Sequence, residues 1–281
     1  MSRIELHCPS CGYDVPPTLM PPPKMFSCPE CLEVMPREKL TRLKVLHRNI
    51  AGANTLTNNM SATVVGSGSF YDPTQATGSL SIANCVFKAG DVCVLCVAMN
   101  LSGGGADISA ANVGGSALSA VSGGPAGQND QIVSMFTRSN ITAGSKTVAI
   151  TSFSINPTAC AAVVVAVSGA KTANANDGSS FNGNTTQAFD TFATSSLLFS
   201  TEFAVAAVAS QNNSLALQPT WNGGFIQPSS SHIGTNSGGP PSDTVIDIAF
   251  KALLSNAAVN ATGTLPSAVD WGAGIVTFKP L

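Results

Sequence analysis

Most of this chain alternates between short apolar runs and loops of small polar residues, and this alternation limits the folds open to it. From about Thr55 onward the runs are rich in Val, Ile and Ala, and loops of Gly, Ser, Asn and Pro separate them. Runs of this kind, bounded by turn-forming residues, are typical of β-strands. Helical periodicity of any length is missing, so the sequence predicts an all-β fold. The predicted strands lie at residues 91–99, 131–136, 146–153, 160–170, 202–210, 244–253 and 272–278.

Many strands joined by long polar loops predict a jelly-roll-like β-sandwich over residues 55–281, with a point near Gly169 at which it could divide into halves. Cys93 and Cys96 form a Cys-x-x-Cys pair inside one predicted strand. Residues i and i+3 of a strand point to opposite faces, so two such thiols cannot easily chelate one ion. We therefore expect them, like Cys85 and Cys160, to be buried core residues.

The two tryptophans of the chain, Trp221 and Trp271, each stand close to glycines, in WNGG and WGAG. An exposed tryptophan pair can form a platform on which a sugar ring stacks. Buried anchors are commoner, so the sequence favours core positions for both, with glycan binding as the alternative.

Two other Cys-x-x-Cys pairs stand near the start of the chain, in HCPSCGYDVPPTLMPPPKMFSCPEC. The pairs Cys8/Cys11 and Cys28/Cys31 are separated by 16 residues, which fits the spacing of about 15–20 residues found in four-cysteine zinc sites. The four thiolates are predicted to bind one zinc ion and to hold residues 1–36 together as a zinc-ribbon-like module. Iron accepts the same tetrahedral set and is the less favoured alternative.

Residues 37–54 are predicted to form a basic, amphipathic linker. Five of the 13 basic residues of the chain gather there. Leu40, Leu43 and Leu46 recur at spacings of three, as on one side of a short helix. A solvated basic face is favoured over nucleic-acid binding, because binding through phosphates needs several cations on one face.

Charge is scarce in the rest of the chain. Charged residues make up 10% of the sequence, against about 25% in an ordinary soluble domain. Residues 49–281 hold six basic and ten acidic residues. A surface of small neutral side chains is poorly protected against association. We therefore expect a homo-oligomer, with a trimer favoured; simple drift toward a neutral surface is the alternative.

Neither a targeting segment nor catalytic machinery is evident. The opening MSRIELHCPS has no apolar core, and no stretch reaches the roughly 18 apolar residues of a membrane span. The eight cysteines suit synthesis in a reducing cytoplasm. Two of the three histidines, His7 and His47, precede the predicted sandwich, and Glu202 is its only glutamate. Motifs for nucleophilic, zinc-protease or phosphate chemistry are absent, so the chain is predicted not to be an enzyme.

Two stretches, SAVDWGAGIVTFKP (267–280) and AVVVAVSGA (162–170), resemble β-sandwich proteins common in bacteriophage genomes. The resemblance covers residues 130–281 loosely and transfers no functional residue. It implies a virion component that is made in the host cytoplasm and contacts the capsid or another virion protein. The favoured role is capsid decoration or cement, with the zinc module as an anchor. The alternatives are a tail- or head-fibre adhesin that binds a host glycan, and an intracellular protein associated with nucleic acid.

Overall fold

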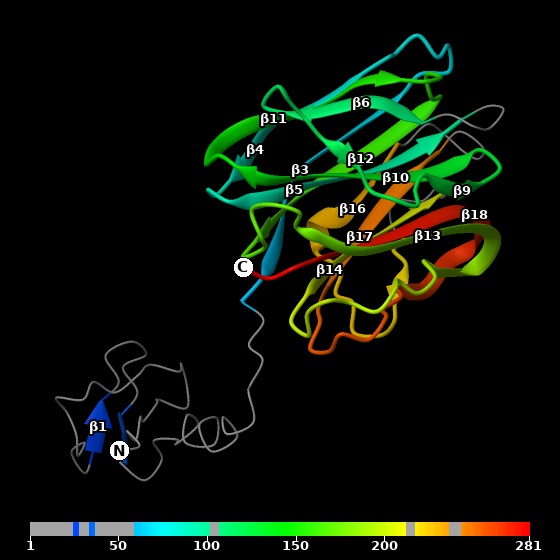
Figure 1. The fold of residues 1–281 in the computed structure, drawn as a ribbon. Coiled ribbons are helices and arrows are strands. Elements are labelled where there is room, and N and C mark those ends of the chain that lie inside the picture. Colours follow the sequence, from blue (N-terminus) through cyan, green and yellow to red (C-terminus); the bar gives the residue numbers. More distant parts are fainter. Residues whose placement is uncertain (1–24, 28–33, 37–58, 102–106, 212–216, 236–242) are drawn as a thin grey trace. The chain divides into compact units, whose positions relative to one another are not determined.

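A computed structural model of the chain describes residues 25–27, 34–36, 59–101, 107–211, 217–235 and 243–281. Contacts divide the chain into two compact units, Met1–Thr57 and Asn58–Leu281. The described part of the first unit is a two-stranded sheet, and the second unit contains three larger sheets (Figure 1).

In the first unit, β1 (Met25–Ser27) pairs antiparallel with β2 (Val34–Pro36). The residues that join these strands in the sequence include Cys28 and Cys31. The zinc module and the linker stay predictions, because their key residues lie outside the described ones. These are the predicted ligands Cys8, Cys11, Cys28 and Cys31 and the predicted linker, residues 37–54.

The second unit is built from antiparallel strands in three sheets. The central sheet has the order β3-β12-β5-β10-β8, with β9 also paired to β10, and the small sheet has the order β4-β11-β6-β7. The third sheet has the order β13-β18-β14-β17-β16, with β15 also paired to β18. The central strands are β3 (Ser61–Tyr71), β5 (Asp91–Asn100), β8 (Ser119–Ala120), β9 (Ala126–Gln128), β10 (Gln131–Ile141) and β12 (Ala159–Ser168). The small sheet holds β4 (Leu80–Phe87), β6 (Ile108–Val113), β7 (Ser116–Ala117) and β11 (Gly144–Phe153). The third sheet holds β13 (Asn176–Asp190), β14 (Phe203–Ser210), β15 (Thr220–Trp221), β16 (His232–Gly234), β17 (Val245–Ala252) and β18 (Thr262–Phe278).

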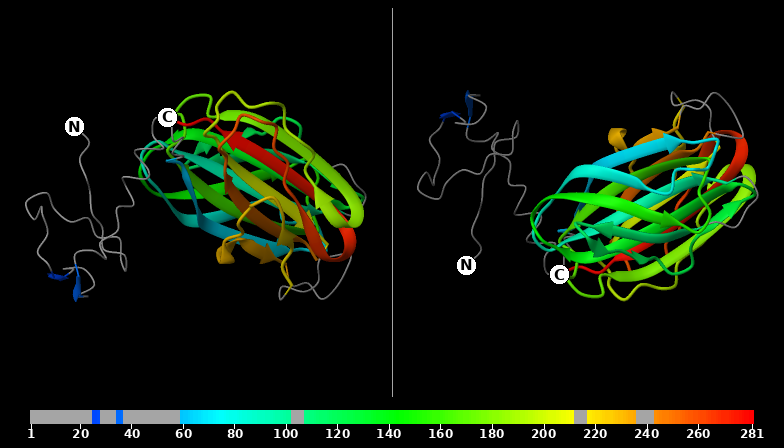
Figure 2. Two further views of the ribbon diagram at one scale, coloured as in Figure 1. Left: turned by 90° about the horizontal axis from the view of Figure 1, so that it is seen from below. Right: turned by 90° about the horizontal axis from the view of Figure 1, so that it is seen from above.

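The three sheets are stacked as layers, with the central sheet in the middle (Figure 1). Figure 2 shows the third sheet in front when the molecule is seen from below, and the small sheet in front when it is seen from above. Up to Ser168 the chain passes back and forth between the central and small sheets, and from Asn176 onward every strand belongs to the third sheet. Gly169 lies at this change, although both parts belong to one compact unit.

The central strands are buried on both faces, which explains their unbroken apolar runs. In β5, Cys93, Leu95, Val97 and Met99 pack in one core cluster with residues of the small sheet. The alternate residues Val92, Val94, Cys96 and Ala98 pack in a second cluster with residues of the third sheet. The expectation that Cys93 and Cys96 point to opposite faces is thus confirmed. All four cysteines of this unit are buried and free, as predicted: Cys85, Cys93, Cys96 and Cys160.

The other face of the third sheet is covered by the loops that join its strands. Two small clusters lie there, one around Ile275 and one around Trp271. Trp271 is 2% exposed, and Trp221 is partly buried against Phe189, with ring centroids 4.9 Å apart. The prediction of a core anchor is confirmed for Trp271, whereas Trp221 is only partly buried and packs against both clusters.

The predicted all-β class is confirmed, and each of the seven predicted strands overlaps a strand of the structure. The described residues contain no α-helix, only a 3-10 turn at Ser229–Ser231. Four long strands were not predicted: β3, β4, β6 and β13. All four have many exposed or half-buried positions, and β3 and β13 are accordingly rich in Ser, Gly, Asn and Thr. Among the described residues, no helix is long and apolar enough to cross a membrane.

One close contact between the central and third sheets requires glycine. A Cβ atom on Gly272 of β18 would overlap the backbone oxygen of Ala126 in β9, and one on Gly183 of β13 would overlap the backbone of Gly127. We predict that Gly272→Ala lowers the free energy of unfolding by about 1–3 kcal/mol, because the sheets must separate to admit the methyl group. Gly78→Ala is the control, since its Cβ would meet nothing closer than Asn156 Oδ1 at 3.5 Å. Urea denaturation of the full chain measures both, and equal stability of the two variants would contradict the packing described.

Candidate functional site

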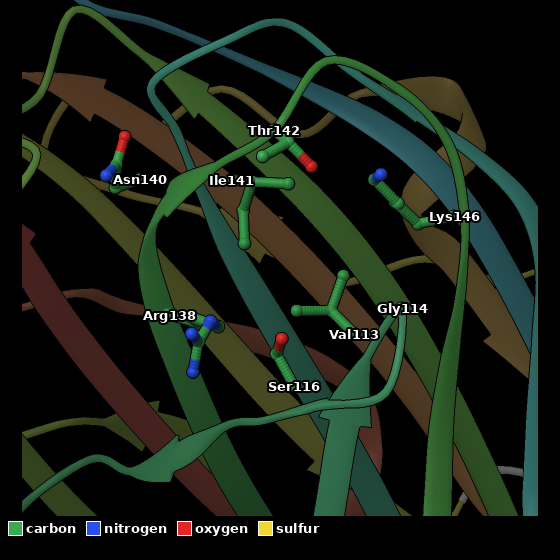
Figure 3. A pocket seen from close by; sticks show the side chains of 8 residues that line it. All are labelled: Val113, Gly114, Ser116, Arg138, Asn140, Ile141, Thr142 and Lys146. Carbon is green, nitrogen blue, oxygen red and sulfur yellow. The ribbon is translucent and has the colours of Figure 1, made fainter.

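The first hollow of interest is a small basic pocket at one end of the sandwich. Its volume is about 130 Å³. Two turns form it: the β6–β7 turn and the β10–β11 turn (Figure 3). The residues that line this basic pocket are Val113, Gly114, Ser116, Arg138, Asn140, Ile141, Thr142 and Lys146.

Both turns follow from residues that adopt positive φ. Gly114 and Gly115 have φ of 55° and 79° between β6 and β7, the pattern of a two-residue hairpin of type I′. Asn140 and Gly144 have φ of 58° and 109° around the second turn, and Asn and Gly are the residues that tolerate this region best. The local sequence thus fixes the two backbone segments that carry the polar side chains of the pocket.

The basic pocket has an apolar floor and a polar rim. Val113 and Ile141 are buried beneath it, whereas Arg138 is exposed and Lys146 is half-buried. The Arg138 guanidinium is held in place because its Nη1 donates a hydrogen bond to the Ala117 carbonyl oxygen at 2.9 Å. The aliphatic stem of Lys146 passes over Gly114, where a Cβ atom would lie 3.2 Å from the lysine Cδ.

The second hollow is apolar and larger, about 620 Å³. Met60, Phe203 and Phe250 form its walls together with Ile226, whose side chain is 73% exposed. Ile226 and Phe250 exchange backbone hydrogen bonds of 2.9 Å, so the loop that follows β15 forms one wall of this apolar groove. It offers contact area but few polar groups.

Asp177 of β13 and the buried Glu202, which immediately precedes β14, form a pair of carboxyl groups in contact. Burial, together with the hydrogen bond to Asp177, raises the pKa of Glu202 to about 7. Burial also opposes ionisation of Asp177, but hydrogen bonds from Glu202 and the Leu198 N–H, and the ammonium of Lys279 at 3.6 Å, hold the pKa of Asp177 below its usual value. The pair therefore shares a proton near neutral pH, with the charge on Asp177.

His232 and Asp247 form a buried contact on neighbouring strands, with the histidine Nδ1 2.7 Å from Asp247 Oδ1. Burial raises the pKa of Asp247, whereas its hydrogen bonds with His232 and Gln227 oppose the rise. Gln227 in turn accepts a hydrogen bond from the Trp221 indole at 2.9 Å. The adjacent hydroxyl of Ser231 donates to the carbonyl oxygens of Pro228 and Ile248. The cluster thus fixes the segment from Trp221 to His232 onto β17.

The raised pKa of Glu202 predicts a pH dependence of stability. The folded state keeps the proton of Glu202 between its ordinary pKa of 4.5 and about 7, whereas the unfolded chain has released it. Stability should therefore fall as the pH rises through this window. The lowered pKa of Asp177 changes the stability only at more acidic pH, below this window. In Glu202→Gln the slope of melting temperature against pH between 5 and 8 should be flatter, whereas Asp190→Asn, which keeps the oxygen that accepts the Phe192 N–H, should keep the wild-type slope. An unchanged slope in Glu202→Gln would refute the assignment.

The structure brings none of the predicted metal ligands into view, because all four lie outside the described residues, and the described ones contain no other group of metal-binding side chains. Sequence reasoning missed the basic pocket, although the Gly114–Gly115 pair between two short runs was the signal for its first turn. No protein-family model matches the chain, and searches of curated proteins and of solved structures give no significant match.

Proposed function

We propose that this protein is a non-enzymatic structural component of a bacteriophage virion, which decorates or cements the capsid. The observation that carries the proposal is the strand order of residues 61–168. Of the ten strands here, eight form two antiparallel sheets in the order β3-β12-β5-β10 and β4-β11-β6-β7, and the short β8 and β9 pair with β10. This order supports a jelly roll, a fold that viral capsid domains share with lectin domains. It supports the resemblance to phage β-sandwich proteins that residues 162–170 and 267–280 suggest.

The surface of the third sheet supports assembly with other copies of the chain. Among the described residues nine large apolar side chains are exposed, and five of them lie in the loops around this sheet: Phe192, Leu198, Leu217, Ile226 and Leu254. The segments that carry Leu198 and Leu254 are adjacent, because the Leu197 N–H donates to the Asn256 carbonyl at 2.9 Å. Apolar side chains that gather in this way mark interaction surfaces more often than scattered ones do. A second copy of this unit, which carries few charges, is the partner that matches it.

The N-terminal module is proposed as the anchor. Cys8, Cys11, Cys28 and Cys31 have the spacing of a zinc site, and β1 and β2 flank the second pair in the sequence as the arms of a hairpin. A small module held by a metal loses little conformational freedom on docking, which favours binding. Zinc is again preferred over iron.

A fibre adhesin is the second candidate, because the basic pocket gives the end of the sandwich a polar hollow in which a ligand can bind. Association with nucleic acid depends on the basic linker, residues 37–54, and stays the third alternative. Quantitative mass spectrometry of purified virions separates the three. Hundreds of copies per particle support cement, a few dozen or fewer support a fibre, and absence from the particle refutes both.

The apolar loops give a prediction about self-association. Full-length protein at tens of micromolar, an ordinary concentration for a modest interface, should sediment as an oligomer, with a trimer expected. The double variant Leu198→Lys, Leu254→Lys should dissociate, because it places two cations in the contact. Val86→Lys is the matched control, since Val86 is 62% exposed on β4 of the small sheet. A monomeric wild type, or equal dissociation in the control, would show that this surface does not hold copies together.

The anchor gives a prediction about metal and attachment. The purified full chain should contain one equivalent of zinc by elemental analysis. Cys28→Ser should lose the zinc and the binding to particles, while the melting transition of the sandwich is kept, because residues 58–281 form a unit with their own cores. Cys96→Ala is the control for loss of a thiol elsewhere. Unchanged particle occupancy in the Cys28→Ser protein would mean that the sandwich, and not the N-terminal module, makes the contact.

A further inference from the structure

The few basic side chains of residues 49–281 are unevenly distributed over the fold. Residues 49–281 contain six basic residues, and three of them have partners within the third sheet and its flanking segments. Lys279 lies 3.6 Å from Asp177, and the ammonium groups of Lys171 and Lys251 lie over the rings of Phe199 and Phe225, at 4.6 and 5.6 Å from the ring centroids. The other three, Lys88, Arg138 and Lys146, belong to the strands and turns of the central and small sheets.

The topology brings these last three cations to one end of the sandwich. Arg138 and Lys146 line the basic pocket. Lys88 lies in the neighbouring turn, because Phe87 pairs with Gly144 and the Gly90 N–H donates to the Ile141 carbonyl at 2.9 Å. The acid of that turn, Asp91, is buried, and its oxygens accept hydrogen bonds from the Lys88 N–H and the Ser168 hydroxyl, both at 2.7 Å.

The cations of the basic pocket have no anionic partner among the described residues. Neither Arg138 nor Lys146 forms an ion pair there, and no described carboxylate lines the pocket. Two like charges held at one hollow repel each other, and the buried Val113 and Ile141 beneath them reduce the screening by water. A bound anion would remove this repulsion.

The side chains around the pocket offer hydrogen-bond donors. In the view of Figure 3, Lys146 and Thr142 lie on one side of Val113 and Ile141, and Arg138 lies on the other, with Ser116 near the floor. Hydroxyls, an amide and two cations are the groups that bind carboxylate, sulfate and phosphate oxygens in proteins. Because the Arg138 Nη1 is already bonded to Ala117, the guanidinium is oriented before any ligand arrives.

We propose that the basic pocket is a binding site for a small oxyanion. Its volume of about 130 Å³ is below the roughly 300 Å³ at which pockets for larger ligands begin, so it admits one inorganic anion or one acidic group of a saccharide, and not a nucleotide. Both sources share the same chemistry, a negatively charged group with two or more oxygens. The site does not depend on the capsid role proposed above, since it requires only the two turns and their side chains.

Isothermal titration calorimetry of the full-length protein tests the site. Sodium phosphate and sodium glucuronate are the two titrants. Ionic strength is held constant with sodium chloride, because screening alone changes the interactions of exposed charges. Binding should saturate at one equivalent, with a dissociation constant on the order of 1 mM for so small a ligand. Tighter binding of glucuronate than of phosphate assigns the site to an acidic sugar, and the reverse order assigns it to a free anion.

Two variants distinguish the pocket from general charge effects. Lys146→Met keeps the stem that packs on Gly114 and removes the charge, so it should weaken binding about tenfold, the effect of losing one charge-assisted hydrogen bond. Lys251→Met, in the third sheet, is the matched control and should bind as the wild type does. Melting temperatures without ligand confirm that both variants fold. The proposal is overturned if neither anion saturates, if glucose binds as well as glucuronate, or if the two variants lose affinity equally.

Discussion

The alternation of side chains in the central sheet is the constraint on which the rest of the molecule depends. From Val92 to Met99 of β5 and from Cys160 to Val167 of β12, each residue packs into one of two cores, so neither face of this part of the sheet is available to water. A sheet of this kind needs a cover on each side. The small sheet provides one cover and the third sheet the other, and the uncharged apolar runs of both strands are the direct result.

The buried strands could be predicted from the sequence because burial on both faces leaves a continuous apolar signal. The edge strands could not. β13 has no Val or Ile in its 15 residues and pairs along its length with β18, so its position is fixed by the partner strand and not by its own side chains. The third layer was also beyond the reach of the sequence, since runs such as β14 look the same whether one sheet or two lie against them.

Among the sites, the thiols were the easiest to interpret. The spacing of Cys93 and Cys96 decides their orientation in any strand, and the structure places them in different cores. The basic pocket was not predictable, because Arg138 and Lys146 belong to different strands and the turn at Gly114 and Gly115 completes it from a third segment. The Asp177 and Glu202 pair likewise depends on the meeting of two distant segments, and neither acid is remarkable in its local sequence.

The stacking of three layers has a consequence for synthesis on the ribosome. β3 is the first strand of this unit to be made, and its neighbour in the central sheet is β12, with Ser67 opposite Val163, so β3 has no sheet partner until β12 has been synthesised. Once the central and small sheets have formed, the valines of β12 that face the third sheet are still exposed. They are covered only when β14, β17 and β18 have been synthesised. Neighbouring nascent chains on one messenger RNA therefore expose the same apolar face of the central sheet to each other. We expect slow folding that is assisted by chaperones.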